Sequence, residues 1–194
     1  KAIELCNKKN MALFHDCGVG KSLTMLEVIQ HFKSIGIGPW LIVAPLSILD
    51  AAWRSDCEKF TPDLSLVNLW SKKPSERKRK LSLDADIFVC NYATFKSLWK
   101  EIQEKKFQGL TVDESSKCKN PTSQITRAIL AMSGIKMRGK NGKSFPVEHI
   151  IPHRYVLTAT PSPNDKSEYW AQTLIVTGPG NKVWNDNYYA FRNR

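Results

Sequence analysis

The sequence predicts an α/β fold, with helices on both faces of a mostly parallel sheet. Short continuous apolar runs, such as residues 40–44, 87–90 and 109–112, are typical of buried strands. Segments whose apolar residues recur at helical spacing separate these runs, and repeated strand–helix alternation is the pattern of parallel sheets. Ligands of such sheets bind at the carboxyl ends of the strands. We therefore expect the polar motifs, which follow the strands, to meet at one edge of the sheet.

The expected elements alternate along the whole chain. Strands are expected at residues 11–14, 40–44, 64–69, 87–90, 109–112 and 155–157. Helices are expected before the first strand, after residue 20, at 50–60, after Pro74, around 95–102 and 125–132, and at 167–175. The apolar faces that define the clearest helices are formed by Met25, Leu26, Ile29 and Phe32, by Trp53, Cys57 and Phe60, by Phe95, Leu98 and Ile102, and by Ile125, Ala128, Ile129 and Met132. The basic, glycine-rich residues 134–144 are interpreted as an insertion.

Composition excludes two classes of protein. The 194 residues are 42% hydrophobic and 24% charged, which argues against a disordered chain, and no apolar run approaches the roughly 18 residues of a membrane-spanning helix. The length suits one globular domain, residues 1–194. Because the chain starts at Lys1 and stops just after an aromatic cluster, we interpret it as a fragment of a longer protein. Five scattered cysteines without a Cys-x-x-Cys pair favour reduced thiols in an intracellular protein.

Residues 14–23 have the chemistry of a phosphate-binding loop. Glycines at positions 18 and 20 allow positive φ and a close approach of the backbone to phosphate. Lys21 supplies an ammonium for the β- and γ-phosphates and Ser22 a hydroxyl for Mg²⁺, while the next helix would direct its N–H groups at the phosphates. His15 stands where the stricter pattern has glycine, so a chance match is the alternative. The candidate nucleotide-binding residues are Asp16, Cys17, Gly18, Val19, Gly20, Lys21, Ser22 and Leu23.

An acidic pair, Asp113-Glu114, directly follows an expected buried strand. Asp113 is suited to holding Mg²⁺ through water, and Glu114 to accepting a proton from an attacking water. With Lys21 they form the set of groups that hydrolyses a nucleoside triphosphate, although a solvated acidic pair is the alternative. Thr158 and Thr160 place two hydroxyls at the end of another strand. There they could bond Asp113-Glu114 and report the nucleotide state, or form a simple polar turn.

The net charge of +11 is concentrated in two segments. Residues 72–80 carry +5 and residues 136–143 carry +4, which leaves the rest of the chain close to neutral. Focused positive charge favours a polyanionic partner, most often nucleic acid, although a solvated helix and a solvated loop explain the two segments equally well. Residues 72–80 follow an expected strand and so begin at its carboxyl edge, whereas residues 136–143 precede one.

Five motifs in order carry a family resemblance: Asp16-Cys17-Gly18-Val19-Gly20-Lys21-Ser22, Val43-Ala44-Pro45-Leu46-Ser47, Cys90-Asn91-Tyr92, Val112-Asp113-Glu114-Ser115-Ser116 and Leu157-Thr158-Ala159-Thr160-Pro161. Together they resemble the first RecA-like lobe of a superfamily 2 helicase, and within that group the Swi/Snf-type ATPases. The stretch 44–49 followed by Trp53 is particularly typical of these ATPases, and residues 189–192 resemble the end of that lobe in phage and bacterial members. The resemblance covers nearly the whole chain.

The resemblance implies a three-layer P-loop NTPase lobe that binds ATP and Mg²⁺ and couples hydrolysis to movement along double-stranded DNA. The residues that it assigns are Lys21, Asp113 and Glu114 for catalysis, Ser22 and Asp113 for Mg²⁺, Thr158 and Thr160 for coupling, and Pro45, Leu46, Ser47, Asn91 and Tyr92 for the DNA-facing edge. Because the resemblance places DNA at the carboxyl edge, the basic residues after the third expected strand should face it as well. These are Arg77, Lys78, Arg79 and Lys80.

The same resemblance implies a second RecA-like lobe in cis that supplies an arginine finger. The chain by itself is therefore expected to hydrolyse ATP weakly or not at all. The adenine-reading segment is expected upstream of Lys1. Ser115-Ser116 differs from the more frequent Ala-His or Ala-Asp, which bears on coupling rather than on magnesium binding. The expected location is the cytoplasm of a bacterial or phage-infected cell, with no membrane partner.

Three other functions stay open from the sequence. A strand-separating DNA or RNA helicase shares these motifs. A nucleotide-regulated nucleic-acid-binding scaffold without turnover is the second, although Lys21, Asp113 and Glu114 count against it. A small-molecule P-loop kinase is the third, and it gives no role to Thr158-Ala159-Thr160 or to the focused basic charge.

Overall fold

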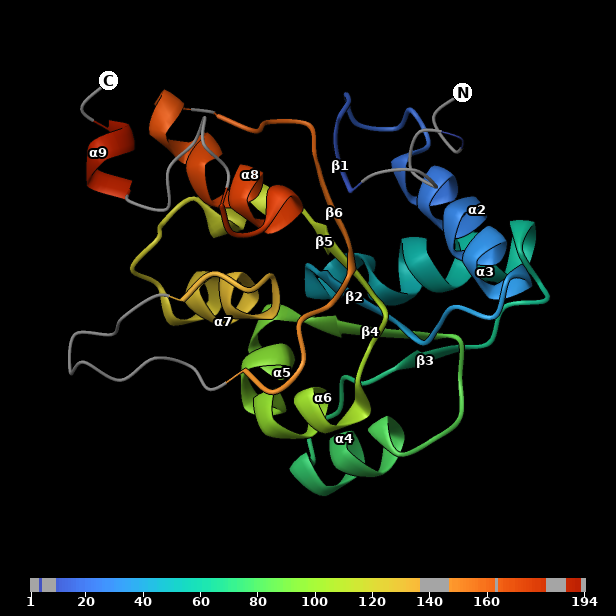
Figure 1. Cartoon of the computed structure of the whole chain (residues 1–194). Coiled ribbons are helices and arrows are strands. Elements are labelled where there is room, and N and C mark those ends of the chain that lie inside the picture. The colour runs from blue at the N-terminus through green and yellow to red at the C-terminus, as the bar shows by residue number, and fades with distance from the viewer. Residues whose placement is uncertain (1–3, 5–9, 137–146, 163, 181–187, 193–194) are drawn as a thin grey trace.

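The computed structural model describes residues 4, 10–136, 147–162, 164–180 and 188–192. In these residues six strands form one sheet with the order β1-β6-β5-β2-β4-β3, and every neighbouring pair is parallel (Figure 1). The strands are β1 (Met11–Phe14), β2 (Trp40–Ala44), β3 (Leu66–Asn68), β4 (Ile87–Asn91), β5 (Gly109–Asp113) and β6 (His153–Thr158). The predicted α/β class with a parallel sheet is confirmed.

Helices cover both faces of the sheet. The α-helices are α2 (Lys21–Ser34), α3 (Ser55–Phe60), α4 (Pro74–Leu81), α5 (Tyr92–Ser97), α6 (Trp99–Lys105), α7 (Gln124–Met132), α8 (Tyr169–Thr177) and α9 (Tyr188–Arg192). The connections from β1 through α2 and α3 run toward β3, and those through α4 to α7 run back toward β6. Because parallel crossovers are right-handed, the change of direction places the second set of helices on the opposite face (Figure 1).

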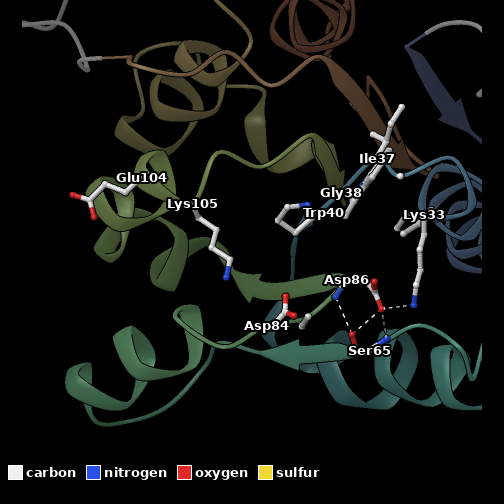
Figure 2. A pocket seen from close by; sticks show the side chains of 13 residues that line it. Lys33, Ile37, Gly38, Trp40, Ser65, Asp84, Asp86, Glu104 and Lys105 are labelled. Carbon is white, nitrogen blue, oxygen red and sulfur yellow. Dashed lines mark hydrogen bonds and ion pairs between the residues drawn. The ribbon is translucent and has the colours of Figure 1, made fainter.

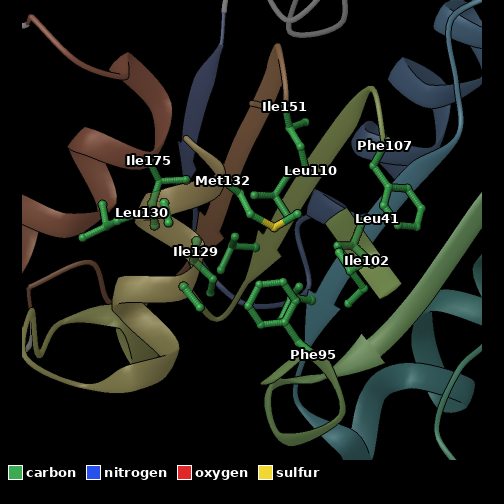
Figure 3. Close-up of a cluster of buried hydrophobic side chains, with 14 of the residues drawn as sticks. Leu41, Phe95, Ile102, Phe107, Leu110, Ile129, Leu130, Met132, Ile151 and Ile175 are labelled. Carbon is green, nitrogen blue, oxygen red and sulfur yellow. The ribbon is translucent and has the colours of Figure 1, made fainter. Parts of the chain in front are cut away.

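Each face of the sheet has its own apolar core. Along β2, Leu41 and Val43 pack on the side of α5 to α8, whereas Ile42 and Ala44 pack on the side of α2 and α3. Figure 3 shows the first of these clusters, in which side chains of the central strands meet those of the surrounding helices. The alternation explains why these strands have continuous apolar sequences, since both of their faces are buried.

Several predicted elements differ in detail. The helix expected at residues 50–60 is divided into a π-helical segment (Leu49–Arg54) and α3, and a 3-10 turn (Leu46–Ile48) precedes them. Trp53 and Cys57 are buried as expected, but Phe60, which was expected on the same face, is the last residue of α3 and is 43% exposed, so this part of the prediction was wrong.

Two further boundaries shift. The helix expected around residues 95–102 is interrupted at Leu98, whose φ of −103° and ψ of 17° separate α5 from α6. The strand expected at 64–69 is shortened to β3. The helix expected before β1 falls largely outside the described residues, as does the basic segment 136–143 apart from Lys136. Within the described part of the chain, no helix combines the length and apolar character needed to cross a bilayer.

Candidate functional site

The sequence-predicted residues lie in order along the carboxyl edge of the sheet. The candidate phosphate-binding loop follows β1, Thr158 ends β6 and Asp113 ends β5, and these strands lie side by side in the order β1-β6-β5. Pro45 follows β2, and Asn91 ends β4 on the other half of the same edge. The candidate nucleotide residues therefore share one half of the edge, and the candidate nucleic-acid residues share the other.

The loop after β1 has the backbone geometry of an anion cradle. Gly18 and Gly20 have φ values of 78° and 83°, in the left-handed region that favours glycine. Gly20 caps α2 without a side-chain hydrogen bond to the helix, and the first turn of α2 contains no acidic residue. Lys21 Nζ donates to the carbonyl oxygens of His15 and Asp16, each at 2.8 Å. The ammonium is thus held over its own loop, beside a helix N-terminus that attracts anions.

Asp113 is a buried carboxylate with two neutral donors. The side chain is only 5% exposed, and its Oδ2 accepts from Trp53 Nε1 at 3.0 Å, while Oδ1 accepts from the Glu114 amide at 2.9 Å. Burial raises the pKa of the Asp113 carboxyl above its ordinary value. The two hydrogen bonds and the charge of Lys21 act in the opposite direction, and the charge of Glu114 adds to the rise. Lys21 and Asp113 are therefore close enough to influence each other.

Glu114 has an unusual backbone conformation that Tyr92 supports. Its φ of 52° and ψ of 50° are left-handed, which is uncommon for a residue other than glycine. The Tyr92 hydroxyl donates to the carbonyl oxygen of Asp113 at 2.6 Å and lies 3.2 Å from that of Glu114. Burial raises the pKa of Tyr92 well above its ordinary value, so the phenol keeps its proton. The Tyr92 side chain is directed into the protein, while Asn91 caps α5 by accepting from the Thr94 amide.

The threonines at the end of β6 reach the acidic pair indirectly. Thr158 is buried and its Oγ1 accepts from the amide of Thr160, which is exposed. Among the hydrogen bonds of the described residues, neither hydroxyl contacts Asp113 or Glu114. Instead, Ser115 Oγ donates to Gln172 Oε1 at 2.6 Å, and Gln172 Nε2 donates to the Pro161 carbonyl at 2.6 Å. The connection between the two motifs therefore passes through a side chain of α8.

The basic segment forms α4, and much of its charge is already engaged. Arg77 Nε donates to the Ser71 carbonyl at 2.6 Å, and Lys80 Nζ to the Trp70 carbonyl at 2.9 Å. The two outermost side chains form ion pairs, Lys78 with Glu101 at 2.5 Å and Arg79 with Glu76 at 3.0 Å. In both pairs the basic side chain is exposed and the acid at least partly so, and at such positions ion pairs are weak and phosphate oxygens compete with carboxylates.

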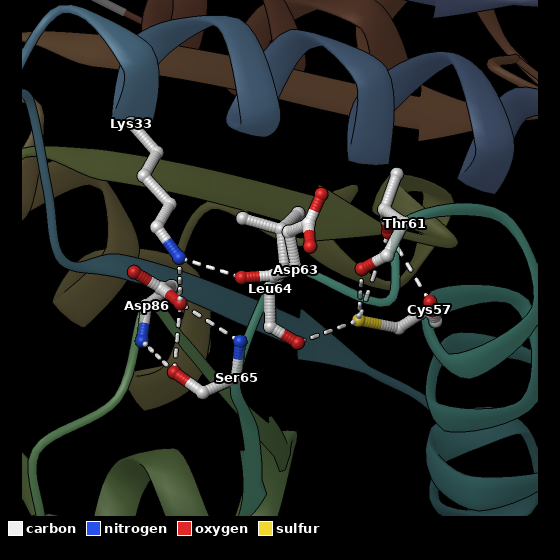
Figure 4. A network of polar contacts seen from close by, with 7 residues as sticks. All are labelled: Lys33, Cys57, Thr61, Asp63, Leu64, Ser65 and Asp86. Atoms are coloured by element: carbon white, nitrogen blue, oxygen red, sulfur yellow. Dashed lines mark hydrogen bonds and ion pairs between the residues drawn. The ribbon is translucent and has the colours of Figure 1, made fainter.

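A separate hollow of about 650 Å³ lies at the opposite, amino edge of the sheet, and none of these residues lines it. Figure 2 shows the side chains of its wall. Its wall includes Lys33, whose Nζ donates to Asp86 Oδ2 at 2.8 Å and to the Asp63 carbonyl at 2.6 Å. Figure 4 shows that Ser65 completes this network on Asp86. These contacts tie the end of α2 to the starts of β3 and β4, which is a structural role.

Sequence reasoning missed the contacts of Trp53 and Gln172. Both were assigned to helices, but neither was expected beside the acidic pair, 60 and 57 positions away from its partner. The one available signal was general: a buried indole N–H or amide requires a hydrogen-bond partner. This rule does not identify which residue the partner is.

The comparison with known families decides the assignment. The SNF2-related domain family matches residues 3–138 of this chain. The chain belongs to the SNF2-related domain family. The match includes the candidate phosphate-binding loop, the acidic pair and α4. It ends before Thr158, whose motif is placed beside the others by the structure.

Individual SNF2-related proteins agree with this assignment. The chain is 27% identical over 177 residues to "Transcription regulatory protein SNF2" of Saccharomyces cerevisiae, covering 88% of this chain and 9% of that protein. It is 30% identical over 132 residues to "Uncharacterized ATP-dependent helicase" of Mycoplasma pneumoniae, covering 66% of this chain and 12% of that protein. The relatives are thus bacterial as well as eukaryotic, and the chain spans only a small part of either.

The SNF2-related chain also has the predicted fold. The Sulfolobus solfataricus SWI2/SNF2 ATPase core, solved in complex with dsDNA, superimposes with a TM-score of 0.74 at 24% sequence identity. The superposition covers 98% of this chain and 36% of that one. This likeness confirms the three-layer architecture that the motifs predicted.

Proposed function

We propose that this chain is the ATP-binding lobe of a DNA translocase, the first of two lobes that together hydrolyse ATP to move along double-stranded DNA. The observation that carries the proposal is the placement of Lys21, after β1, and of Asp113 and Glu114, at the end of β5, along one edge of the sheet with only β6 between them, where the charge of Lys21 acts on Asp113. An uncapped helix N-terminus adjoins this cluster. Family membership supports the proposal, since relatives are described as ATP-dependent helicases and a chromatin-remodeling ATPase.

In this proposal the loop binds the triphosphate. The N–H groups of α2 and the Lys21 ammonium meet the β- and γ-phosphates, and Lys21 exchanges its contacts with the His15 and Asp16 carbonyls for phosphate oxygens. The space around Gly18 and Gly20 is open, because a Cβ added at either position would have no atom within 4 Å. This opening leaves room for the ligand.

The donors present fit Mg²⁺ rather than a softer metal. Ser22 offers a hydroxyl and Asp113 a carboxylate, both oxygen ligands. Within the described residues, no three His, Cys, Asp or Glu side chains form a metal cluster. Mg²⁺ needs none, because it is usually held by one or two carboxylates, substrate phosphates and water. Bound there, Mg²⁺ would neutralise charge that develops on the phosphates.

Glu114 is the candidate general base. Its side chain is partly exposed beside the buried Asp113, so water can reach it. The left-handed backbone of Glu114 and the Tyr92 hydroxyl on its carbonyl oxygen fix the direction in which the Glu114 side chain leaves the backbone after β5. Thr158 and Thr160 are proposed to couple this site to its surroundings through Gln172.

The test is ATP hydrolysis by the protein that carries both lobes. Lys21→Ala should abolish nucleotide-dependent activity, and Glu114→Gln should lower kcat by ~10²–10⁴-fold while Mg²⁺–ATP still binds. The matched control is Glu104→Gln, which removes an exposed acid of α6 and should leave kcat unchanged. A near wild-type rate for Glu114→Gln would show that the base lies elsewhere.

The DNA contact is proposed at the half of the edge formed by β2, β4 and β3. Its candidate residues are Pro45, Leu46, Ser47 and Asn91, the backbone at Tyr92, and Arg77, Lys78, Arg79 and Lys80. The logarithm of DNA affinity falls linearly with the logarithm of salt concentration, and each lost phosphate contact should reduce the magnitude of this salt slope by about 0.9. Lys78→Gln with Arg79→Gln should flatten that slope, whereas Lys105→Gln with Lys106→Gln, an equal charge change at the end of α6, should not. Equal slopes for both variants would remove α4 from the interface.

A further inference from the structure

Trp53 connects two parts of the molecule that have different proposed roles. It lies near the end of the segment that starts at Pro45, follows β2 and includes the exposed Leu46 and Ser47. Its indole N–H donates to the Asp113 carboxylate at 3.0 Å. Trp53 is fully buried and Asp113 is 5% exposed, so water does not compete for this hydrogen bond.

The segment that carries Trp53 has a distinctive conformation. Residues Leu49–Arg54 are π-helical, between a 3-10 turn and α3. Single π turns are rare overall and are found frequently at functional sites. Here the π segment sets the direction of the Trp53 ring, because a regular helix from the same start would rotate that side chain away from its observed position. The indole therefore lies under the end of β5.

The second candidate DNA segment, Asn91-Tyr92, also contacts Asp113. Tyr92 follows Asn91 at the end of β4, and its hydroxyl donates to the Asp113 carbonyl at 2.6 Å. Trp53 thus holds the carboxylate of Asp113, and Tyr92 holds its backbone. Both segments proposed to face DNA end in a side chain that is hydrogen-bonded to the proposed magnesium ligand.

We propose that Trp53 is a positioning residue that transmits the placement of the Pro45–Ser47 segment to the Asp113 carboxylate. The inference rests on the proposed function, since it assigns a role in ATP hydrolysis. A shift of the segment on binding DNA would move the indole, and the indole would turn the carboxylate relative to Ser22 and the phosphates. Groups that orient a metal ligand in this way typically affect activity by ~10–100-fold.

The chain offers a closely matched control. Trp40 is also buried, at 1% exposed, and its Nε1 donates to Thr111 Oγ1 at 2.9 Å, two residues before Asp113 on the same strand. Trp53→Phe and Trp40→Phe each keep an aromatic ring and remove one buried N–H donor. Only the first of these changes removes a donor from the proposed site.

The experiment measures kcat and KM for ATP in the protein carrying both lobes, with and without duplex DNA. Trp53→Phe should lower the DNA-stimulated kcat by ~10–100-fold, with KM changed far less, and Trp40→Phe should stay within about twofold of wild type. Equal losses in the two variants would make Trp53 an ordinary core residue and overturn the inference. Wild-type protein without DNA-stimulated hydrolysis would instead contradict the proposed function.

A second readout needs no substitution and covers the case in which Trp53→Phe fails to fold. In the same protein, labelled with ¹⁵N at tryptophan, the indole N–H resonances of Trp53 and Trp40 are assigned and followed. Addition of Mg²⁺ and ADP, and then of duplex DNA, should shift the Trp53 resonance at both steps and leave that of Trp40 in place. A Trp53 resonance that responds to nucleotide but not to DNA would contradict the proposed connection.

Discussion

Two aspartates at opposite edges of the sheet have opposite electrostatic environments. Asp86 precedes β4 at the amino edge and accepts from Lys33 Nζ and from the amide and hydroxyl of Ser65, all within 2.8 Å. Burial raises its pKa, but these hydrogen bonds and the Lys33 charge outweigh burial and hold the pKa below its ordinary value. Asp113 at the carboxyl edge has only neutral hydrogen-bond donors, and burial keeps its pKa raised.

The two carboxylates therefore have opposite effects on the stability of the fold. Ionised Asp86 stabilises the fold, because the folded state favours its charged form more than the unfolded chain does. Ionised Asp113 lowers the stability, because the folded state favours its protonated form. A carboxylate that is buried and held in place against this cost is typical of a functional site. The amino edge thus serves the fold, and the carboxyl edge holds the residues that are proposed to serve the reaction.

The largest expected effect comes from Asp113→Asn. Hydrolysis should fall by more than ~10²-fold, because the proposed magnesium ligand is lost. The free energy of unfolding at pH 7 should change by less than about 1 kcal/mol, because removal of a buried charge is offset by the loss of one acceptor: the asparagine amide has a single oxygen for the Trp53 indole and the Glu114 amide, which donate to separate oxygens of Asp113. Parallel ATPase and denaturant-unfolding measurements check both values. A variant that is strongly destabilised and still active would reverse the distinction between the two edges.

Gly109→Ala changes the other end of the same strand. A Cβ at Gly109 would lie 2.1–2.3 Å from ring atoms of Trp40, which is closer than any real contact. Overpacking of this kind costs about 1–3 kcal/mol of stability. Denaturant unfolding should show that loss, whereas KM for ATP should be unchanged in the folded protein. Gly38→Ala, where no atom lies within 4 Å of the added carbon, is the control. If Gly109→Ala kept wild-type stability, the tight packing at this end would be refuted.

Asp86→Asn should have the smallest effect, and that effect should depend on pH. Its side chain would lose acceptor capacity for three donors, so we expect a loss of about 1–2 kcal/mol at pH 7. Because the folded pKa is depressed, the contribution of Asp86 is present above its unfolded value of about 4 and disappears as the pH falls through the folded value. The difference in the free energy of unfolding between wild type and variant should therefore shrink as the pH falls below 4. A constant difference down to acid pH would exclude ionisation as the cause.

Much of the fold could be predicted from local sequence. Buried strands such as β2 and β5 appear as continuous apolar runs with nearly correct ends, because their two faces pack against different helices. The loop at Gly18–Ser22 and the pair Asp113-Glu114 could be placed at one edge because parallel strands share a direction. Local pattern sufficed wherever the burial period or a strand end decided the outcome.

The remaining features depend on contacts between distant segments. Phe60 was expected on the face of Trp53 and Cys57 but is exposed at the last residue of α3, because helical spacing does not show where a helix leaves the core. The bonds of Trp53 to Asp113 and of Ser115 to Gln172 join residues that are far apart in the sequence. Likewise, the charge of Lys78 was visible in the sequence, but its pairing with Glu101 was not. Polar pairs of this kind become visible only when the tertiary fold is known.

The most direct measurement is a crystal structure of the protein with Mg²⁺ and a non-hydrolysable ATP analogue. We predict that Lys21 Nζ leaves the His15 and Asp16 carbonyls for the γ-phosphate and that Mg²⁺ lies beside Ser22 and Asp113. We also predict that the Asp113 carboxylate keeps its hydrogen bond to Trp53. A nucleotide bound elsewhere, or a Lys21 side chain still on its own loop beside the bound triphosphate, would contradict the assignment of this edge as the catalytic site.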